Sequence, residues 1–459
     1  MAAPSSPQPR VMVLPFPAQG HVMPLMKLSH RLVDHGLEVD FVNTDFNHAR
    51  VLKVMAAETG AAAGGIHMVS FPDGMGPDGY RTDIAMLGNG LPAAMLGPLE
   101  ETIRSRKIKW VIADVSMSWA MELAATAGVR VALFSTFSTA VVALRLHVPK
   151  LIDDGIIDEC GTVMRNEMIH LSPKMPPIEA AEIPWASLGG SPDRMRVFIK
   201  NVLKTNPAIS LAAAVICNTF EEIESDALDL VPNALPVGPL EAPLASSSSS
   251  AAGQFWPEDA TCLAWLDAQT RGSVIYVAFG SFTVLDAAHF EELADGLELT
   301  GRSFLWAVRP NFTDGVVGEG WLDAFKRRVE GKGLVVGWAP QQRVLAHPSV
   351  ACFVSHCGWN STMEALRHGV PFLCWPYFAD QFCNQSYVCN VWGTGVKLLA
   401  DKRGVVTKEE IKNKVAHLLS DEKIKARVAM WKHAACASIA EGGSSHVNLL
   451  KLVNLLREQ

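Results

Sequence analysis

The sequence predicts two α/β domains, each a doubly wound parallel sheet with helices on both faces. Short apolar strand patterns alternate with longer stretches of helical periodicity, and this alternation recurs in both halves of the 459-residue chain. Between the halves lies a polar low-complexity tract, Ser246 to Ser250, which cannot bury apolar surface. Because one domain usually holds roughly 100 to 200 residues, we expect the chain to form two.

The strand and helix patterns follow the order of βαβ units. In the first half, the strand pattern Val11 to Leu14 precedes a helix pattern, Leu25 to His35, and a second strand, Glu38 to Asn43. Trp110 to Ala113 and Ala120 to Ala127 repeat the strand and helix order. The second half offers five more strand candidates: Val274 to Phe279, Phe304 to Val308, Leu334 to Gly337, Cys352 to Ser355 and Pro371 to Trp375.

We therefore expect a first Rossmann-like domain at residues 1–240, a linker at 241–257 and a second Rossmann-like domain at 258–440. Residues 441–459 are predicted to form a C-terminal helix. Two doubly wound domains that face each other would direct the carboxyl ends of both sheets into a cleft, where ligands bind in such folds.

Composition excludes several classes of protein. Hydrophobic residues make up 49% of the chain and charged residues 19%, which argues against extended disorder. A net charge of −7 argues against nucleic acid as a partner. The first apolar run is broken at Pro15, and no run reaches the roughly 18 apolar residues of a membrane span. We expect a soluble, cytoplasmic monomer whose nine cysteines are reduced.

The strand Cys352 to Ser355 leads into a pattern that suits an anion. His356, Cys357 and Gly358 follow the strand, and Asn360 then opens a helix. The backbone N–H groups at a helix start carry partial positive charge, which suits a diphosphate. The same pattern is common at helix starts that bind nothing, so the local residues leave both interpretations open.

The longer stretch around this pattern resembles a known family. From Trp338 to Gln381 the chain reads WAPQQRVLAHPSVACFVSHCGWNSTMEALRHGVPFLCWPYFADQ, which is similar to the signature box of plant family-1 UDP-dependent glycosyltransferases. The resemblance includes PFPAQGHVMPLMKL near the N-terminus and the overall length. It implies the GT-B fold, a UDP-sugar held mainly by the C-terminal domain and an acceptor held mainly by the N-terminal one. It also implies that the final helix packs back on the N-terminal domain.

The resemblance assigns donor-binding roles by position. Aromatic and amide side chains suit the uridine, a carboxylate suits the ribose diol, and polar groups at a helix start suit the diphosphate. A glutamine at the last position of the box is associated in the family with glucose, so we expect UDP-glucose as donor substrate. The implied residues are Trp338, Ala339 and Gln341 for the uridine, Glu364 for the ribose, His356, Asn360, Ser361 and Ser281 for the diphosphate, and Trp359, Asp380, Gln381 and Thr136 for the sugar.

Two residues are candidates for the catalytic pair. His21 follows the first strand, before a helix expected to start near Pro24, and Asp114 follows the strand Trp110 to Ala113. An imidazole can accept a proton near neutral pH, and a carboxylate can hold its tautomer. Both occupy the dyad positions of the family, which implies direct displacement with inversion at the anomeric carbon. The chain has no DxD triplet to hold a metal, so we expect no metal and no cofactor.

The predicted function is glucose transfer to a hydroxyl of a small apolar acceptor, such as a flavonoid, a phenylpropanoid or another plant secondary metabolite. Met75 to Met95 and Leu144 to Trp185 are rich in apolar residues and are the candidate acceptor region. A nucleotide-sugar hydrolase or epimerase and a catalytically silent UDP-sugar-binding protein remain alternatives. A dinucleotide oxidoreductase is disfavoured, because the turn PFPAQGH contains only Gly20 and lacks G-x-G-x-x-G.

Overall fold

The computed structural model describes residues 9–58, 65–76, 81, 84–187, 192–241, 254–309 and 320–458. Contacts divide the chain into two compact units. Unit 1 comprises Met1–Ala181, Leu188–Trp256 and Ala437–Gln459, and unit 2 comprises Glu182–Ser187 and Pro257–Cys436. Most of the predicted linker, including the serine tract, lies outside the described residues.

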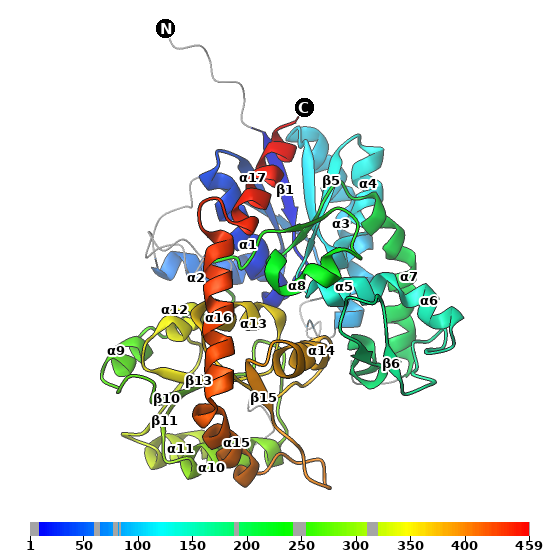
Figure 1. Ribbon diagram of the computed structural model, residues 1–459. Helices are drawn as coiled ribbons and strands as arrows, with labels where there is room; N and C mark the ends of the chain where they lie inside the picture. Colours follow the sequence, from blue (N-terminus) through cyan, green and yellow to red (C-terminus); the bar gives the residue numbers. More distant parts are fainter. Residues whose placement is uncertain are drawn as a thin grey trace. The chain divides into compact units, whose positions relative to one another are not determined.

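Unit 1 is built on a seven-stranded parallel sheet (Figure 1). Its strands are β1 (Arg10–Leu14), β2 (Glu38–Thr44), β3 (Ile66–Phe71), β4 (Trp110–Asp114), β5 (Arg130–Ser135), β8 (Val215–Cys217) and β9 (Ala234–Pro236). The strand order is β3-β2-β1-β4-β5-β8-β9, so the order reverses between β1 and β4. In a doubly wound sheet this reversal is the place where ligands bind. The predicted doubly wound sheet is confirmed.

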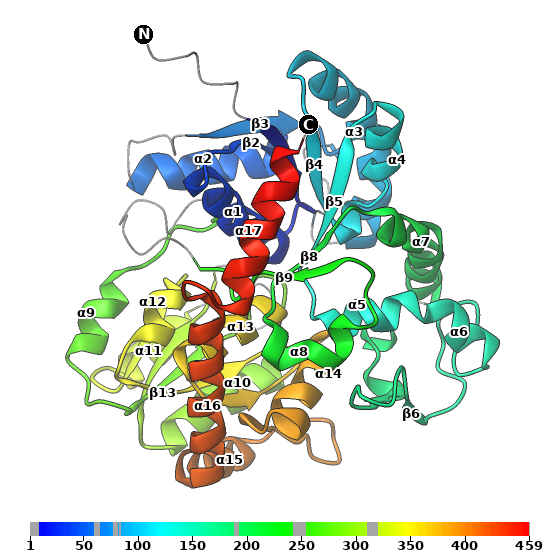
Figure 2. The ribbon, with the colours of Figure 1, turned by 45° about the horizontal axis from the view of Figure 1, so that its top comes forward.

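Helices cover both faces of this sheet (Figure 2). The helices of unit 1 are α1 (Gln19–Asp34), α2 (Asp45–Glu58), α3 (Ile84–Ser105), α4 (Ala120–Thr126), α5 (Thr139–Leu146), α6 (Val148–Asp153), α7 (Pro192–Leu211), α8 (Glu221–Leu228) and α17 (Ser444–Arg457), with the 3₁₀ turn η1 (Val115–Met117). The 3₁₀ turn η2 (Ala180–Glu182) begins in unit 1, and its last residue belongs to unit 2. Val11 and Val13 of β1 share one buried cluster with Leu25 and Leu28 of α1 and Leu452 of α17. The alternate residues of β1 therefore face this helix layer. A short antiparallel pair, β6 (Met168–Ile169) and β7 (Ile178–Glu179), completes unit 1.

The first helix starts earlier than the sequence predicts. The carbonyl of Ala18 accepts hydrogen bonds from the N–H groups of His21 and Val22, both at 2.9 Å, and this closes a helical turn ahead of Pro24. His21 therefore lies in the first turn of α1 and not in a loop before the helix.

The last helix, α17, is attached to unit 1 by specific polar contacts as well as by its apolar face. Ser445 Oγ donates to the carbonyl of Gly238 at 2.6 Å, and Asn448 Nδ2 donates to the carbonyl of Pro236 at 3.1 Å. These two bonds fix the start of α17 at the end of β9.

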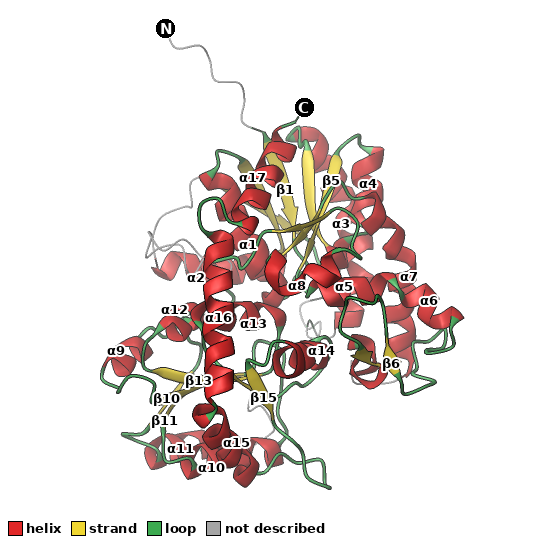
Figure 3. Ribbon diagram, viewed as in Figure 1, coloured by secondary structure: helices red, strands yellow, loops and turns green. Residues whose placement is uncertain are grey.

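Unit 2 repeats the architecture with a six-stranded parallel sheet (Figure 3). Its strands are β10 (Val274–Ala278), β11 (Ser303–Ala307), β12 (Gly333–Val336), β13 (Val350–Ser355), β14 (Phe372–Cys374) and β15 (Gly395–Lys397), in the order β12-β11-β10-β13-β14-β15. Its helices are α9 (Thr261–Asp267), α10 (Ala287–Leu299), α11 (Trp321–Arg328), α12 (Gln341–Ala346), α13 (Trp359–His368), α14 (Gln381–Ser386) and α15 (Lys408–Ser420), with the short turns η3 (Pro184–Ser187) and η5 (Tyr387–Val391). Helix α16 (Glu422–Ile439) begins in unit 2 and its last residues belong to unit 1.

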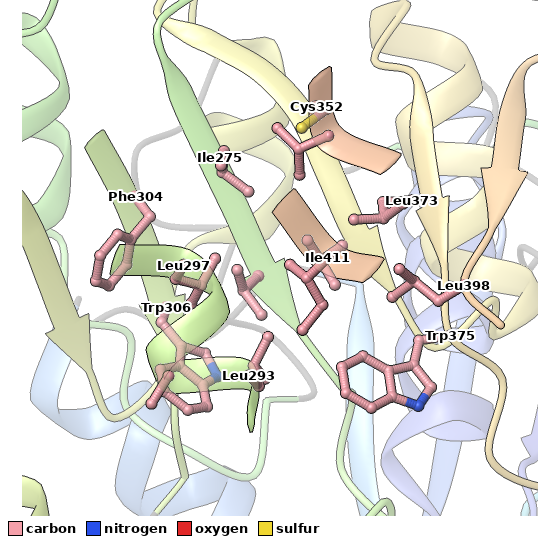
Figure 4. Close-up of a cluster of buried hydrophobic side chains, with 14 of the residues drawn as sticks. Ile275, Leu293, Leu297, Phe304, Trp306, Cys352, Leu373, Trp375, Leu398 and Ile411 are labelled. Atoms are coloured by element: carbon pink, nitrogen blue, oxygen red, sulfur yellow. The ribbon is translucent and has the colours of Figure 1, made fainter. Parts of the chain in front are cut away.

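The core of unit 2 lies between its sheet and helices α10, α11 and α15. Figure 4 shows Ile275 and Trp306 of the sheet beside Leu293 of α10 and Ile411 of α15. Helix α15 comes close to α10 at Gly296, where a Cβ would lie 2.9 Å from Ile411 Cδ1. Within the described part of the chain, no helix is long and apolar enough to span a membrane.

Candidate active site

Two neighbouring strands of unit 1 bring His21 and Asp114 together. Leu14 of β1 pairs with Ala113 of β4, so the residues that follow both strands emerge at one edge of the sheet. The Nδ1 atom of His21 lies 2.7 Å from Oδ2 of Asp114. A carboxylate only accepts hydrogen bonds, so Nδ1 carries the proton and Nε2 keeps its lone pair. The predicted pair therefore has the geometry of a general base with its orienting acid.

The surroundings hold this pair in place. Asp114 is fully buried, and its second oxygen accepts a hydrogen bond from the N–H of Ser116 at 2.7 Å. The His21 side chain is 18% exposed, and the rings of Phe16 and Phe137 lie 5.2 and 5.6 Å from its ring. Thr136 Oγ1 lies 3.0 Å from His21 Nδ1. The imidazole is thus oriented by buried polar groups and bordered by two aromatic rings that the sequence did not single out.

In unit 2, the predicted anion site falls on the turn between β13 and α13. Cys357 has a left-handed backbone, with φ of 64°, and Gly358 begins α13 without a side-chain cap. The His356 ring fits between two glycines, because a Cβ at Gly280 or Gly358 would lie 2.7 or 2.5 Å from its Nε2. Burial lowers the pKa of His356 to about 4. The imidazole is therefore neutral at neutral pH and can still donate one N–H to an anion.

Three predicted residues, Gln341 for the uridine, Ser361 for the diphosphate and Glu364 for the ribose, meet in one hydrogen-bonded cluster. Gln341 Nε2 donates to Ser361 Oγ at 2.9 Å and to Glu364 Oε2 at 2.8 Å. Gln342 Nε2 donates to the other oxygen of Glu364 at 3.3 Å, and the Tyr276 hydroxyl donates to Gln341 Oε1 at 3.2 Å. The sequence analysis did not select Gln342 or Tyr276. Gln342 could have been selected from the sequence, because it directly follows Gln341 at the start of α12.

The predicted sugar-reading pair stands at the start of α14. Gln381 Oε1 accepts hydrogen bonds from the N–H groups of Tyr377 and Phe378, at 2.8 and 3.1 Å. This fixes the amide so that its Nε2 donors point away from the loop. Asp380 Oδ2 accepts from Asn384 Nδ2 at 2.7 Å. The same Asn384 amide donates to the carbonyl of Cys357 at 3.0 Å, so a residue absent from our prediction links the pair to the turn between β13 and α13, the predicted diphosphate turn.

The other predicted residues are placed as follows. Trp338 is partly buried just after β12, with Ala339 buried beside it, while Ser281 and Asn360 are partly buried after β10 and at the start of α13. The Trp359 indole is only 3% exposed and packs against Trp392, with ring centroids 6.2 Å apart. Its side chain therefore belongs to the core.

The candidate acceptor stretches are only partly described. Residues 77–80 and 82–83 of the first lie outside the described residues. In the second, Leu144 and Leu151 are buried, whereas Met164 and Met168 are 61% and 48% exposed. Among the residues that the structure places, no group of three or more His, Cys, Asp or Glu side chains could hold a metal ion.

Comparison with protein families gives two matches. Residues 250–433 match the model described as UDP-glucoronosyl and UDP-glucosyl transferase. Residues 8–73 match the model of the glycosyltransferase N-terminal domain. The two matches fall on the two halves of the chain that carry the donor cluster and the His21 side chain.

Curated and solved proteins extend the similarity to the whole chain. UDP-glycosyltransferase 83A1 of Arabidopsis thaliana is 40% identical, over 98% of this chain and 97% of that protein. A 7-deoxyloganetin glucosyltransferase of Catharanthus roseus is 31% identical, over 99% and 98%. Among solved structures, a UDP-glucosyltransferase from Polygonum tinctorium capable of glucosylating indoxyl, in complex with 3,4-dichloroaniline, is 27% identical with a TM-score of 0.83, over 99% and 100%. Phytolacca americana UGT2, solved with UDP-2fluoro-glucose and pterostilbene, is 25% identical with a TM-score of 0.79, over 98% and 100%.

The predicted GT-B fold and the predicted enzyme class are confirmed by these relatives. With two parallel-sheet domains and full-length similarity at 40% identity, the chain belongs to the plant UDP-glycosyltransferase family and is a UDP-glycosyltransferase.

Proposed function

We propose that this enzyme transfers glucose from UDP-glucose to a hydroxyl of a small apolar acceptor, with inversion at the anomeric carbon. The observation that carries the proposal is the contact of 2.7 Å between His21 Nδ1 and the buried Asp114 carboxylate. Two relatives support a small acceptor. One is described as capable of glucosylating indoxyl, and the other was solved in complex with pterostilbene.

In the proposed reaction, His21 is the general base. Its Nε2 removes the proton of the acceptor hydroxyl while that oxygen attacks the anomeric carbon of the sugar. The bond from the anomeric carbon to the diphosphate oxygen breaks, and UDP leaves with the electron pair. Asp114 stabilises the imidazolium that forms and keeps the ring in one tautomer.

We assign the donor to unit 2. The start of α13 and the neutral His356 offer N–H donors to the diphosphate, and they stabilise the charge that develops on the leaving group. Glu364 accepts hydrogen bonds from the ribose hydroxyls, and Trp338 stacks on the uracil. The oriented Nε2 of Gln381, together with Asp380, reads the hydroxyls of glucose. Thr136 contributes a hydroxyl beside the base.

Replacement of the base tests the mechanism. His21→Ala should lower kcat by about 10² to 10⁴ fold, the usual range for a positioned base, while UDP affinity persists. His67→Ala is the matched control, because His67 is an exposed histidine on β3. Full activity of His21→Ala would exclude His21 as the base.

Product analysis tests the rest of the proposal. With UDP-glucose and a phenol, the expected product is a β-glucoside, identified by the anomeric coupling in its proton NMR spectrum. Gln381→His should shift the preference from UDP-glucose toward UDP-galactose. Release of free glucose at the same rate without a phenol would indicate a hydrolase, and UDP binding without turnover would indicate a silent binding protein.

A further inference from the structure

The side chain of Arg145 places a cation on α5 of unit 1. Arg145 stands in the last turn of α5, the helix that begins just after Thr136 and Phe137. Its guanidinium is partly buried, and no carboxylate within the described residues forms an ion pair with it. Buried charges are usually paired, because removing an isolated charge from water is costly. Arg145 is therefore a partly buried charge whose hydrogen-bond partners Asn206 and Thr205 are neutral.

Neutral groups of α7 hold the guanidinium in one orientation. Arg145 Nε donates to Asn206 Oδ1 at 3.1 Å, and Nη2 donates to Thr205 Oγ1 at 2.5 Å. Asn206 is 8% exposed, and its Nδ2 donates back to the carbonyl of Arg145 at 2.8 Å. Two of the three guanidinium nitrogens are thus engaged by neutral oxygens, and Nη1 makes no hydrogen bond among the described residues.

The Asp114 carboxylate, which acts electrostatically on Arg145, already has a partner at each of its oxygens. One oxygen of Asp114 contacts His21, and the other accepts from the N–H of Ser116. Burial lowers the pKa of Arg145 to about 10, and the Asp114 carboxylate opposes part of that shift. The guanidinium is still charged at neutral pH, and it lies within electrostatic range of the catalytic pair.

We propose that Arg145 binds a carboxylate of the acceptor, so that the enzyme glucosylates hydroxyl groups of hydroxylated carboxylic acids such as phenolic acids. An arginine whose remaining donors are held in a fixed plane binds a carboxylate with geometric specificity. The anchored carboxylate would direct the acceptor hydroxyl, at the other end of the molecule, toward His21. This inference names the acceptor class of the reaction proposed above and rests on that proposal.

Matched acid and ester acceptors test the inference. The probes are 4-hydroxybenzoic acid, 4-hydroxyphenylacetic acid and 3-(4-hydroxyphenyl)propanoic acid, each compared with its methyl ester. We expect the wild-type enzyme to have a higher kcat/KM for at least one acid than for its ester. Arg145→Gln should lower this acid-to-ester ratio by about 10 to 100 fold, the range for loss of hydrogen bonds to a charged group. Arg145→Lys should give an intermediate ratio, because it keeps the charge and loses the planar fork.

Controls separate a specific effect from misfolding. Arg104→Gln, an exposed arginine paired with Glu100 on α3, should leave the ratio unchanged. UDP affinity reports whether each variant is folded. If Arg145→Gln does not fold, Asn206→Ala removes the Nε partner and should lower the ratio by about 3 to 10 fold, as expected for one hydrogen bond.

The outcomes distinguish this inference from the function on which it rests. An unchanged ratio in folded Arg145→Gln, or a wild-type enzyme that accepts neutral phenols and esters but none of the acids, would overturn the role of Arg145 and leave glucosyl transfer intact. Failure to transfer glucose to any acid, ester or neutral phenol would contradict the proposed function itself.

Discussion

The proposed catalytic pair of unit 1 and the proposed donor cluster of unit 2 are both polar groups at the carboxyl edge of a parallel sheet, but different elements hold them. His21 lies in the first turn of the helix after β1, Asp114 is the last residue of the adjacent strand β4, and Asp114 is fully buried. In unit 2, Gln341 and Glu364 stand on two helices and bond to each other through their side chains. Both pairs are joined by a side-chain contact, but the first stands at the ends of two paired strands and the second on two helices.

This difference predicts different kinetic consequences. A base that is already oriented contributes in the transition state, so damage to it should lower kcat. In the proposed binding mode, the ribose replaces the amide donors of Gln341 and Gln342 at Glu364 with its own hydroxyl donors. Damage there should therefore raise KM for the donor more than it lowers kcat.

The largest effect should come from Asp114→Asn. The change keeps the size of the side chain but removes the charge that stabilises the imidazolium, and it favours the wrong tautomer of His21. We expect kcat to fall by about 10² to 10⁴ fold with little change in KM for UDP-glucose. Steady-state kinetics measure both constants. If KM rose and kcat did not fall, the contrast between the two sites would be wrong.

Glu364→Gln should have the next largest effect. It removes the charged acceptor of the proposed ribose bonds, and it places a third amide beside Gln341 and Gln342. We expect KM for UDP-glucose to rise by about 10 to 100 fold, the range for hydrogen bonds to a charged group. Glu409→Gln, at an exposed position on α15, is the matched control. An unaltered UDP dissociation constant, measured by titration calorimetry, would remove Glu364 from the donor site.

Gly358→Ala tests how tightly the diphosphate turn is packed. Its φ of −62° is open to any residue, but the added Cβ would lie 2.5 Å from His356 Nε2. We expect a loss of about 1 to 3 kcal/mol in unfolding free energy, as for an overpacked core, together with weaker UDP binding. Thermal unfolding of this variant is compared with that of Gly337→Ala, where nothing lies within 4 Å of the added atom. Equal melting temperatures would show that the imidazole moves aside freely.

A further prediction concerns pH. Burial holds the pKa of His356 at about 4, below its ordinary value of about 6.5. Between these values the unfolded chain binds a proton that the folded chain does not, so stability falls as pH decreases from about 6.5 to 4. One such proton contributes at most about 1.4 kcal/mol per pH unit. His356→Gln should therefore show a shallower decline of melting temperature over this window, and a slope equal to that of the wild type would contradict the assignment.

Many residues of the candidate site could be predicted because they lie just after strands, and each strand is recognisable from a short run of neighbouring residues. The strands that hold His21 and Asp114 were recognisable from short apolar runs, and the stretch from Trp338 to Gln381 is continuous. The contacts that no local pattern indicated join distant segments. Asn384 reaches back to Cys357, and the α7 residues Thr205 and Asn206 hold Arg145 from some 60 positions away.

The sequence alone therefore determined the alternation of strands and helices, the two doubly wound domains and the enzyme family, because periodicity and motif spacing are properties of neighbouring residues. Only the tertiary structure decided that α1 begins at Gln19, that the Trp359 side chain belongs to the core and that residues 182–187 belong with unit 2. It also decided that neutral side chains of α7, and no carboxylate of the described residues, hold Arg145. These outcomes depend on which surfaces pack together, and packing is a relation among residues far apart in the chain.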